Sequence, residues 1–246
     1  MLIKRVCAEF VGTAFLLLAI VGSGIMAQRL AGGSVALALL ANALATGGAL
    51  VALILAFGPI SGAHLNPAVT LVDAWQGGLS WRDVPGYLAA HFCGALSGVA
   101  LANVMFGLPP FFASHHVRSG SAQWVSEFVA TFGLLAVVWG CARARPGAAP
   151  FAVAAYIVAA YWFTPSTSFA NPAVAVARSL TDTFAGIRPN DVVPFIAAQL
   201  AGAAAATGLF AWLSPAIQRT ADAVILPHPA DALDEHHRER ELASSS

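Results

Sequence analysis

The sequence predicts an all-α integral membrane protein with six transmembrane helices and two re-entrant half-helices, arranged as an inverted repeat. Three observations support this. Of 246 residues, 58% are apolar and only 10% are charged, whereas soluble domains carry about 25% charged residues. Six apolar stretches approach the roughly 20 residues that a helix needs to cross a bilayer. The tripeptide Asn-Pro-Ala occurs twice, at corresponding places in two halves of the chain.

The chain shows six candidate spans and two shorter apolar stretches. The shorter stretches, about 66–76 and 171–182, cannot cross a bilayer, and each opens with Asn-Pro-Ala, as a half-helix would. Residues 216–246 are rich in charge and serine, which predicts a soluble, disordered tail after a channel domain at 1–215. The expected spans are about 6–28, 35–57, 84–106, 123–142, 149–165 and 191–213.

Positive charge favours one orientation of these spans. An even number of spans puts both termini on one side, and the cytoplasmic side of membrane proteins carries the excess of Lys and Arg. With the termini inside, six basic residues lie near the cytoplasm and three lie outside. The chain is therefore expected to be a multi-pass protein of the cell (inner) membrane with cytoplasmic termini. The inner set is Lys4, Arg5, Arg82, Arg143, Arg145 and Arg219, and the outer set is Arg29, Arg118 and Arg188.

Three markers recur in the same order, which predicts repeats at about 5–110 and 122–215. Residues 8–13 match 126–131, the segment around the first Asn-Pro-Ala matches that around the second, and residues 91–95 match 199–203 more weakly. Each copy holds three spans and one half-helix. Because three is odd, the second copy enters the membrane from the opposite side, and the two half-helices start near the midplane.

The two tripeptides fit the first turn of a helix that lines a wet cavity. Proline at the first helical position loses no hydrogen bond, and the preceding asparagine caps the helix while its NH₂ faces the lumen. Two helix N-termini at one spot create a positive bias that opposes cations but tolerates neutral solutes. A pair of Pro-kinked core helices is the alternative reading. The motifs are Asn66-Pro67-Ala68 and Asn171-Pro172-Ala173.

Glu9 and Glu127 are the carboxylates within the first and fourth spans. An acid in a membrane needs a partner, and repeat-related acids suit hydrogen bonding to the half-helix loops, with a proton relay as the sharper alternative. We find no metal triad, nucleophile pair or phosphate loop, so no enzyme activity, cofactor or metal site is expected. The 12 basic and 12 acidic residues balance, and nucleic acid is not an expected partner.

Together these motifs resemble the aquaporin, or major intrinsic protein, family over roughly residues 5–215. The resemblance implies an aquaporin-like bundle of six helices and two half-helices. It also implies a homotetramer with one pore per subunit, with Asn66 and Asn171 as the solute-binding amides. The expected partners are then small neutral solutes and the lipid bilayer.

One position departs from the family pattern. Members normally place arginine directly after the second Asn-Pro-Ala, and here that position is Val174. The next arginine, Arg178, either lines the outer vestibule or is neutralised by Asp182 at i+4. The remaining filter candidates are mostly small, which predicts a wide and weakly cationic filter. They are Thr46 on the second span, Ala159 or Ala160 on the fifth, and Ser168 and Phe169 in the second loop.

A wide, weakly polar filter should pass small neutral polyols such as glycerol, water and neutral hydroxides. The valine and residues 177–187 resemble bacterial aquaglyceroporins associated with arsenic resistance, which implies arsenite, as As(OH)₃, and methylated arsenicals as solutes. A narrow water-selective aquaporin and a proton-coupled secondary transporter of a small solute are the alternatives.

Overall fold

A computed structural model describes residues 2–213, apart from the side chains of residues 143 and 144. All regular elements in this range are helical, and six helices are long and apolar enough to cross a membrane. This confirms the predicted fold class, while the predicted tail lies outside the described residues. The helices are α1 (Leu2–Leu30), α2 (Val35–Ser61), α3 (Pro67–Gln76), α4 (Val84–Met105), α5 (Ser121–Ala144), α6 (Ala149–Phe163), α7 (Pro172–Arg178) and α8 (Val192–Leu213).

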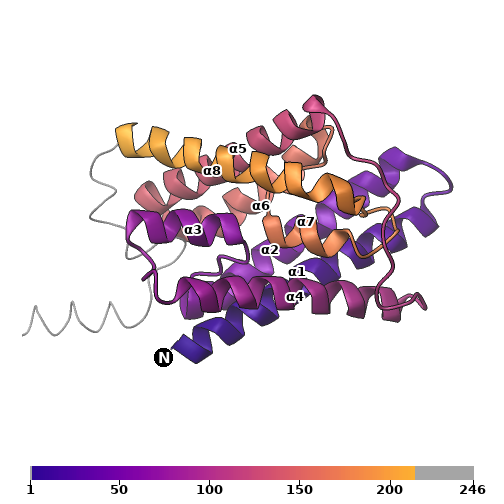
Figure 1. Cartoon of the computed structure of the whole chain (residues 1–246), viewed down its shortest axis with the longest axis horizontal. Helices are drawn as coiled ribbons and strands as arrows, with labels where there is room; N and C mark the ends of the chain where they lie inside the picture. The colour runs from indigo at the N-terminus through magenta and orange to yellow at the C-terminus, as the bar shows by residue number, and fades with distance from the viewer. Residues whose placement is uncertain (1, 214–246) are drawn as a thin grey trace, which may run out of the picture.

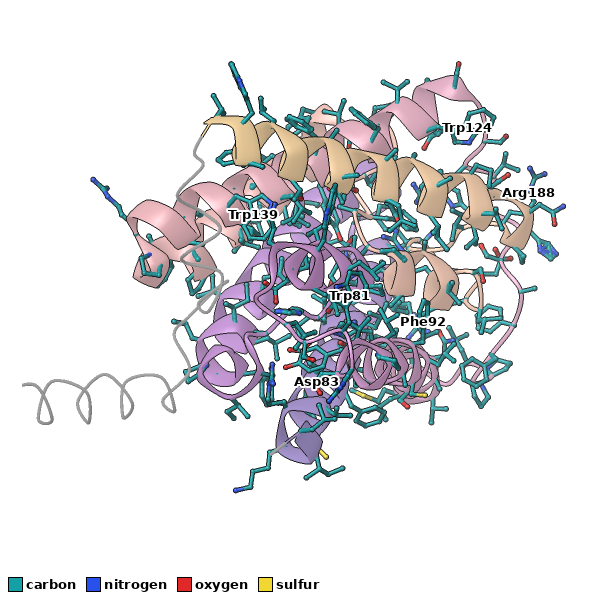
Figure 2. All side chains as sticks on the ribbon, turned by 60° about the vertical axis from the view of Figure 1, so that its left-hand side comes forward. Trp81, Asp83, Phe92, Trp124, Trp139 and Arg188 are labelled. Carbon is teal, nitrogen blue, oxygen red and sulfur yellow. The ribbon has the colours of Figure 1, made fainter. Side chains whose placement is uncertain are left out.

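The six long helices form a bundle around the two short ones. Figure 1 shows α3 and α7 roughly in line inside the bundle, α3 toward one end and α7 toward the other. The start of α1 and the end of α8 lie at the same end of the bundle (Figure 1). Trp124, near the start of α5, and Arg188, just before α8, lie at the opposite end (Figure 2). Two helices that enter from opposite ends are what an inverted repeat requires.

Both half-helices begin as their sequences predict, but α7 ends earlier. Asn66 and Asn171 have extended backbones, and each Oδ1 accepts a hydrogen bond from the backbone N–H two residues on, at 2.9 and 3.0 Å. The expected end of α7 at residue 182 is wrong, since the helix stops at Arg178. The Ser179 hydroxyl donates to the Val176 carbonyl at 2.7 Å, a local bond that competes with continuation of the helix.

Glycines allow close helix approaches at equivalent places in the two halves. A Cβ on Gly94 of α4 would overlap the backbone carbonyl of Phe10 on α1. A Cβ on Gly202 of α8 would overlap the carbonyl of Phe128 on α5 in the same way. Small residues let membrane helices pack backbone to backbone, and the matched contacts show that the weak third marker of the repeat has a structural basis.

Replacing Gly202 by alanine is expected to lower thermal stability, because the added methyl must push α8 away from α5. Overpacking of this kind typically costs about 1–3 kcal/mol. Gly208 on the same helix has open space around its Cα, so Gly208→Ala is the matched control and should cause no loss. The unfolding midpoint in detergent checks both variants. Equal midpoints for the two would show that α8 shifts freely and that the close contact is dispensable.

Candidate functional site

A cavity enclosing about 640 Å³ of empty space, open solvent included, runs beside the starts of the two half-helices. Its wall is mostly apolar and is drawn from both halves of the chain. The first and fourth spans contribute side chains at equivalent positions of the repeat, and α2 and α6 complete the wall. These side chains are Leu16 and Ile20 on α1, Leu134 and Val138 on α5, Ile54 on α2, and Ile157 on α6.

The two motif asparagines line this cavity and bind each other's loops. Asn66 Nδ2 donates to the carbonyl of Ala170, and Asn171 Nδ2 donates to the carbonyl of Leu65, both at 2.8 Å. The half-helices therefore meet at their starting residues. An amide nitrogen carries two hydrogens, so each asparagine keeps a second donor for a molecule in the cavity.

Glu127 holds the loop that precedes α7. Its Oε1 accepts from the backbone N–H of Phe169, and its Oε2 accepts from that of Ala170, both at 2.9 Å. Gln199 of α8 adds a bond to Oε2 at 2.6 Å. Ala170 and the nearby Ser168 have φ values of 47° and 49°, a strained conformation outside glycine. The fully buried carboxylate satisfies the N–H groups that this conformation turns inward.

Glu9 does the same for the loop that precedes α3. Its two oxygens accept from the backbone N–H groups of His64 and Leu65, at 3.0 and 2.7 Å, and from the Ser61 hydroxyl at 2.6 Å. His91 Nε2 lies 2.8 Å from Oε2. His91 thus takes the place that Gln199 takes in the other half. Each oxygen of both acids accepts at least one hydrogen bond, which favours support of the loops over proton transfer.

His64 lines the cavity on the side of α3. Its Nδ1 lies 2.9 Å from the hydroxyl of Thr70, and its Nε2 lies 3.4 Å from a carboxylate oxygen of Asp73. Both partners belong to α3, so the imidazole ties the loop to the half-helix that follows it.

The structure brings most of the expected filter residues to the cavity, but not those on the fifth span. Thr46, Ser168, Phe169 and Val174 line it, whereas Ala159 and Ala160 do not, and Tyr161 lies there instead. On the fifth span the cavity is thus lined by a residue one or two positions beyond the expected Ala159 or Ala160. The cavity face of α6 carries Val153, Ile157 and Tyr161 at intervals of four, and this spacing was the signal in the sequence. The Tyr161 hydroxyl lies 3.4 Å from that of Thr46.

Arg178 lines the cavity and is not neutralised by Asp182. That carboxylate accepts from the backbone N–H of His115 at 2.8 Å and from the Ser114 hydroxyl at 3.4 Å. The Nε of Arg178 donates instead to the carbonyl of Ala185, and its guanidinium carbon lies 3.5 Å from the centroid of the Phe169 ring. Of the two alternatives for Arg178, the structure favours the vestibule.

Arg118 is a second cation at this end, and sequence reasoning gave it no role beyond an outer charge. It reaches in from the loop between α4 and α5, where its Nε donates to Gly186 O at 2.8 Å and its Nη1 to Ser166 O at 3.0 Å. Burial lowers the pKa of Arg118 to about 10, so it remains protonated at neutral pH. Its guanidinium carbon lies 5.0 Å from the Phe169 centroid. Nothing in the sequence around a loop arginine signals such burial.

The chain resembles known proteins in sequence and in fold. The family model "Major intrinsic protein" matches residues 1–167. Aquaglyceroporin AqpS of Rhizobium meliloti (strain 1021) is 54% identical over 86% of this chain and 91% of its own length. Aquaporin NIP1-4 of Oryza sativa subsp. japonica is 34% identical over 89% of this chain and 79% of its own.

The fold comparison agrees with the sequence comparison. The X-ray structure of the aquaglyceroporin from Plasmodium falciparum superposes with a TM-score of 0.65, at 20% identity, over 89% of this chain and all of that one. At 20% identity this match is evidence for the fold alone. The paired half-helices and the sequence matches are further evidence. The chain therefore belongs to the major intrinsic protein family of membrane channels.

Proposed function

We propose that this chain is a passive pore for small neutral hydroxylated solutes, chiefly polyols such as glycerol. One observation carries the proposal. Two asparagine amides line a mostly apolar cavity, and a small apolar side chain, Val174, stands directly after the second motif. The names of the bacterial relative and of the solved structure, both aquaglyceroporins, support it.

The cavity wall suits an amphipathic solute. A polyol has a hydrocarbon side that can rest on the leucine, isoleucine and valine side chains, and hydroxyls that can replace lost water bonds. The polar groups of the wall include the amides of Asn66 and Asn171 and the hydroxyls of Tyr161 and Thr46. A polar group of the solute that loses its water without gaining a new hydrogen bond costs about 1–3 kcal/mol of free energy. Hydrogen bonds to these groups therefore lower the free-energy barrier to passage of a dehydrated solute.

Neutral metalloid hydroxides such as arsenite, with methylated arsenicals, are included in the proposal. As(OH)₃ is uncharged at neutral pH and presents three hydroxyls around a compact centre, so the same donors and acceptors serve it. The sequence resemblance to arsenic-associated relatives is the further support.

The surroundings of the pore are proposed in the same way. We place the protein in the cell membrane as a homotetramer with both termini in the cytoplasm, so that α7 lies in the outer half. The six apolar helices and the excess of basic residues at the end where α1 begins support this orientation.

Stopped-flow light scattering on proteoliposomes tests the proposed function. An inward glycerol gradient should give shrinkage and then fast re-swelling, while a sucrose gradient should give shrinkage alone. Shrinkage accelerated over empty liposomes without re-swelling would instead favour a water-selective channel. Flux that saturates and follows a proton gradient would favour a coupled transporter. Arsenite uptake into the same vesicles tests the extension to metalloid hydroxides.

Replacing Val174 by arginine is expected to lower glycerol permeability at least tenfold and water permeability less. A long cationic side chain there would fill space beside Phe169 and the Asn171 amide, and a barrier rise of about 1.4 kcal/mol is tenfold in rate. The same stopped-flow traces measure both solutes. Val174→Leu, which adds one methylene without charge, is the control and should have a smaller effect. Unchanged permeabilities in Val174→Arg would remove Val174 from the filter.

A further inference from the structure

Arg178 is held rigidly at the side of the cavity. The residue is 2% exposed, its Nε donates to the Ala185 carbonyl, and its guanidinium carbon lies 3.5 Å from the centroid of the Phe169 ring. Phe169 is itself fixed by an edge-on contact with Phe195, at 5.3 Å between centroids. Residue 178 therefore presents its charge at a defined place, about one helical turn (~5.4 Å) beyond Val174 along α7.

Donors of this guanidinium remain after these contacts. The group has five N–H bonds, of which the Nε–H is used. Among the described residues, Nη1 is buried without a hydrogen-bond partner, while Nη2 is not buried in this way and donates to no protein group, so Nη2 is the nitrogen open to the cavity. The nearby carboxylates are engaged elsewhere. Asp182 accepts from the Ser114 hydroxyl at 3.4 Å and from the His115 backbone at 2.8 Å. Asp191 accepts from the Arg118 backbone and the Arg188 side chain, both at 2.8 Å. Glu127 accepts from the backbones of Phe169 and Ala170 and from the Gln199 side chain. Within residues 2–213, Arg178 forms no ion pair.

The neighbouring cation has a different task. Arg118 donates hydrogen bonds to the carbonyls of Gly186 and Ser166. These bonds hold the loops before and after α7 in place. Unlike Arg178, Arg118 does not line the cavity. One arginine thus stabilises the loops, and the other faces the cavity with an unpaired charge and unused donors.

We propose that Arg178 is a specificity-determining residue of this pore, which donates hydrogen bonds to the hydroxyl oxygens of neutral solutes and excludes cations. This deepens the proposed function and rests on it. A positive charge without an ion-pair partner in a low-dielectric cavity repels cations strongly, because Coulomb energy rises as the dielectric falls. The same charge strengthens the hydrogen bonds that a neutral hydroxyl accepts. Arg178 thereby supplies, from one turn further along α7, a cation that position 174 lacks.

Replacement of Arg178 by methionine in the full-length protein tests this. Glycerol flux is measured by stopped flow, and proton leak by a pH-sensitive dye inside the same proteoliposomes under a potassium diffusion potential. Arg178→Met should raise proton leak at least tenfold over the unaltered protein. Arg29→Met is the control, since it removes a charge from the same end of the bundle but from a side chain bound to the Phe106 carbonyl, and it should change neither readout.

Arg178→Lys keeps the positive charge but removes the planar set of guanidinium donors. It also tests the inference if Arg178→Met fails to fold. It should keep cations excluded while glycerol flux falls severalfold, because lysine lacks the bidentate geometry. Unchanged glycerol flux in Arg178→Lys, or a folded Arg178→Met protein that leaks no more than the unaltered one, overturns the inference. Absence of glycerol flux in the unaltered protein would instead refute the proposed function itself.

Discussion

Replacing Glu127 by alanine is expected to prevent recovery of folded protein. The change leaves the backbone N–H groups of Phe169 and Ala170 and the amide of Gln199 without their acceptor, deep inside the bundle. Each buried donor left unsatisfied costs about 1–3 kcal/mol, so three of them approach the 5–15 kcal/mol by which typical proteins are stable. The yield of monodisperse protein in detergent and its unfolding midpoint measure the loss.

Glu127→Gln is the informative companion. It keeps an acceptor oxygen of the same shape, so the protein should fold with a lower unfolding midpoint. It cannot exchange a proton, yet glycerol flux per folded molecule should persist, since we assign the carboxylate to support of the loop. A folded glutamine variant that conducts nothing would revive the proton-relay alternative. Full stability of Glu127→Ala would contradict the role of Glu127 as a brace.

Much of the fold could be predicted because the bilayer constrains it. Apolar length alone placed the six spans within a few residues, and the doubled Asn-Pro-Ala placed the starts of both half-helices. The end of α7 escaped prediction. Residues 179–182 look permissive for a helix, but the Ser179 bond to the preceding turn, the loop contacts of Asp182 and backbone bonds from residues 112 and 114 to the carbonyls of Leu180 and Ser179 oppose it.

The site was predictable where a short motif specifies it and less so where packing does. Each asparagine caps its own helix, so its place follows from its neighbours in sequence. The residue that α6 presents to the cavity depends on the rotation of that helix about its axis. A count from the second motif through a loop of uncertain length therefore missed Tyr161. Arg118 depends on contacts 48 and 68 residues away, which local sequence cannot reveal.

Asn171→Lys is expected to reduce the flux of every solute to that of empty liposomes. Lysine has no acceptor, so the N–H groups of Ala173 and Val174 lose their cap. Its four-carbon chain and ammonium would occupy the space where the two half-helices meet, close to the carbonyl of Leu65 that the Asn171 amide now binds. Glycerol re-swelling and osmotic water shrinkage, normalised to folded protein in each vesicle, measure the effect.

Asn171→Ser separates blockage from loss of the cap. Serine caps helices nearly as well as asparagine and is smaller, so α7 should persist and the lumen should stay open. We expect this variant to retain measurable glycerol flux, reduced because the amide donor to the solute is gone. Asn66→Lys should block as Asn171→Lys does, since the two residues hold reciprocal bonds. Full flux through a folded lysine variant would mean that solutes bypass the asparagine pair, and the cavity would then not be the conducting path.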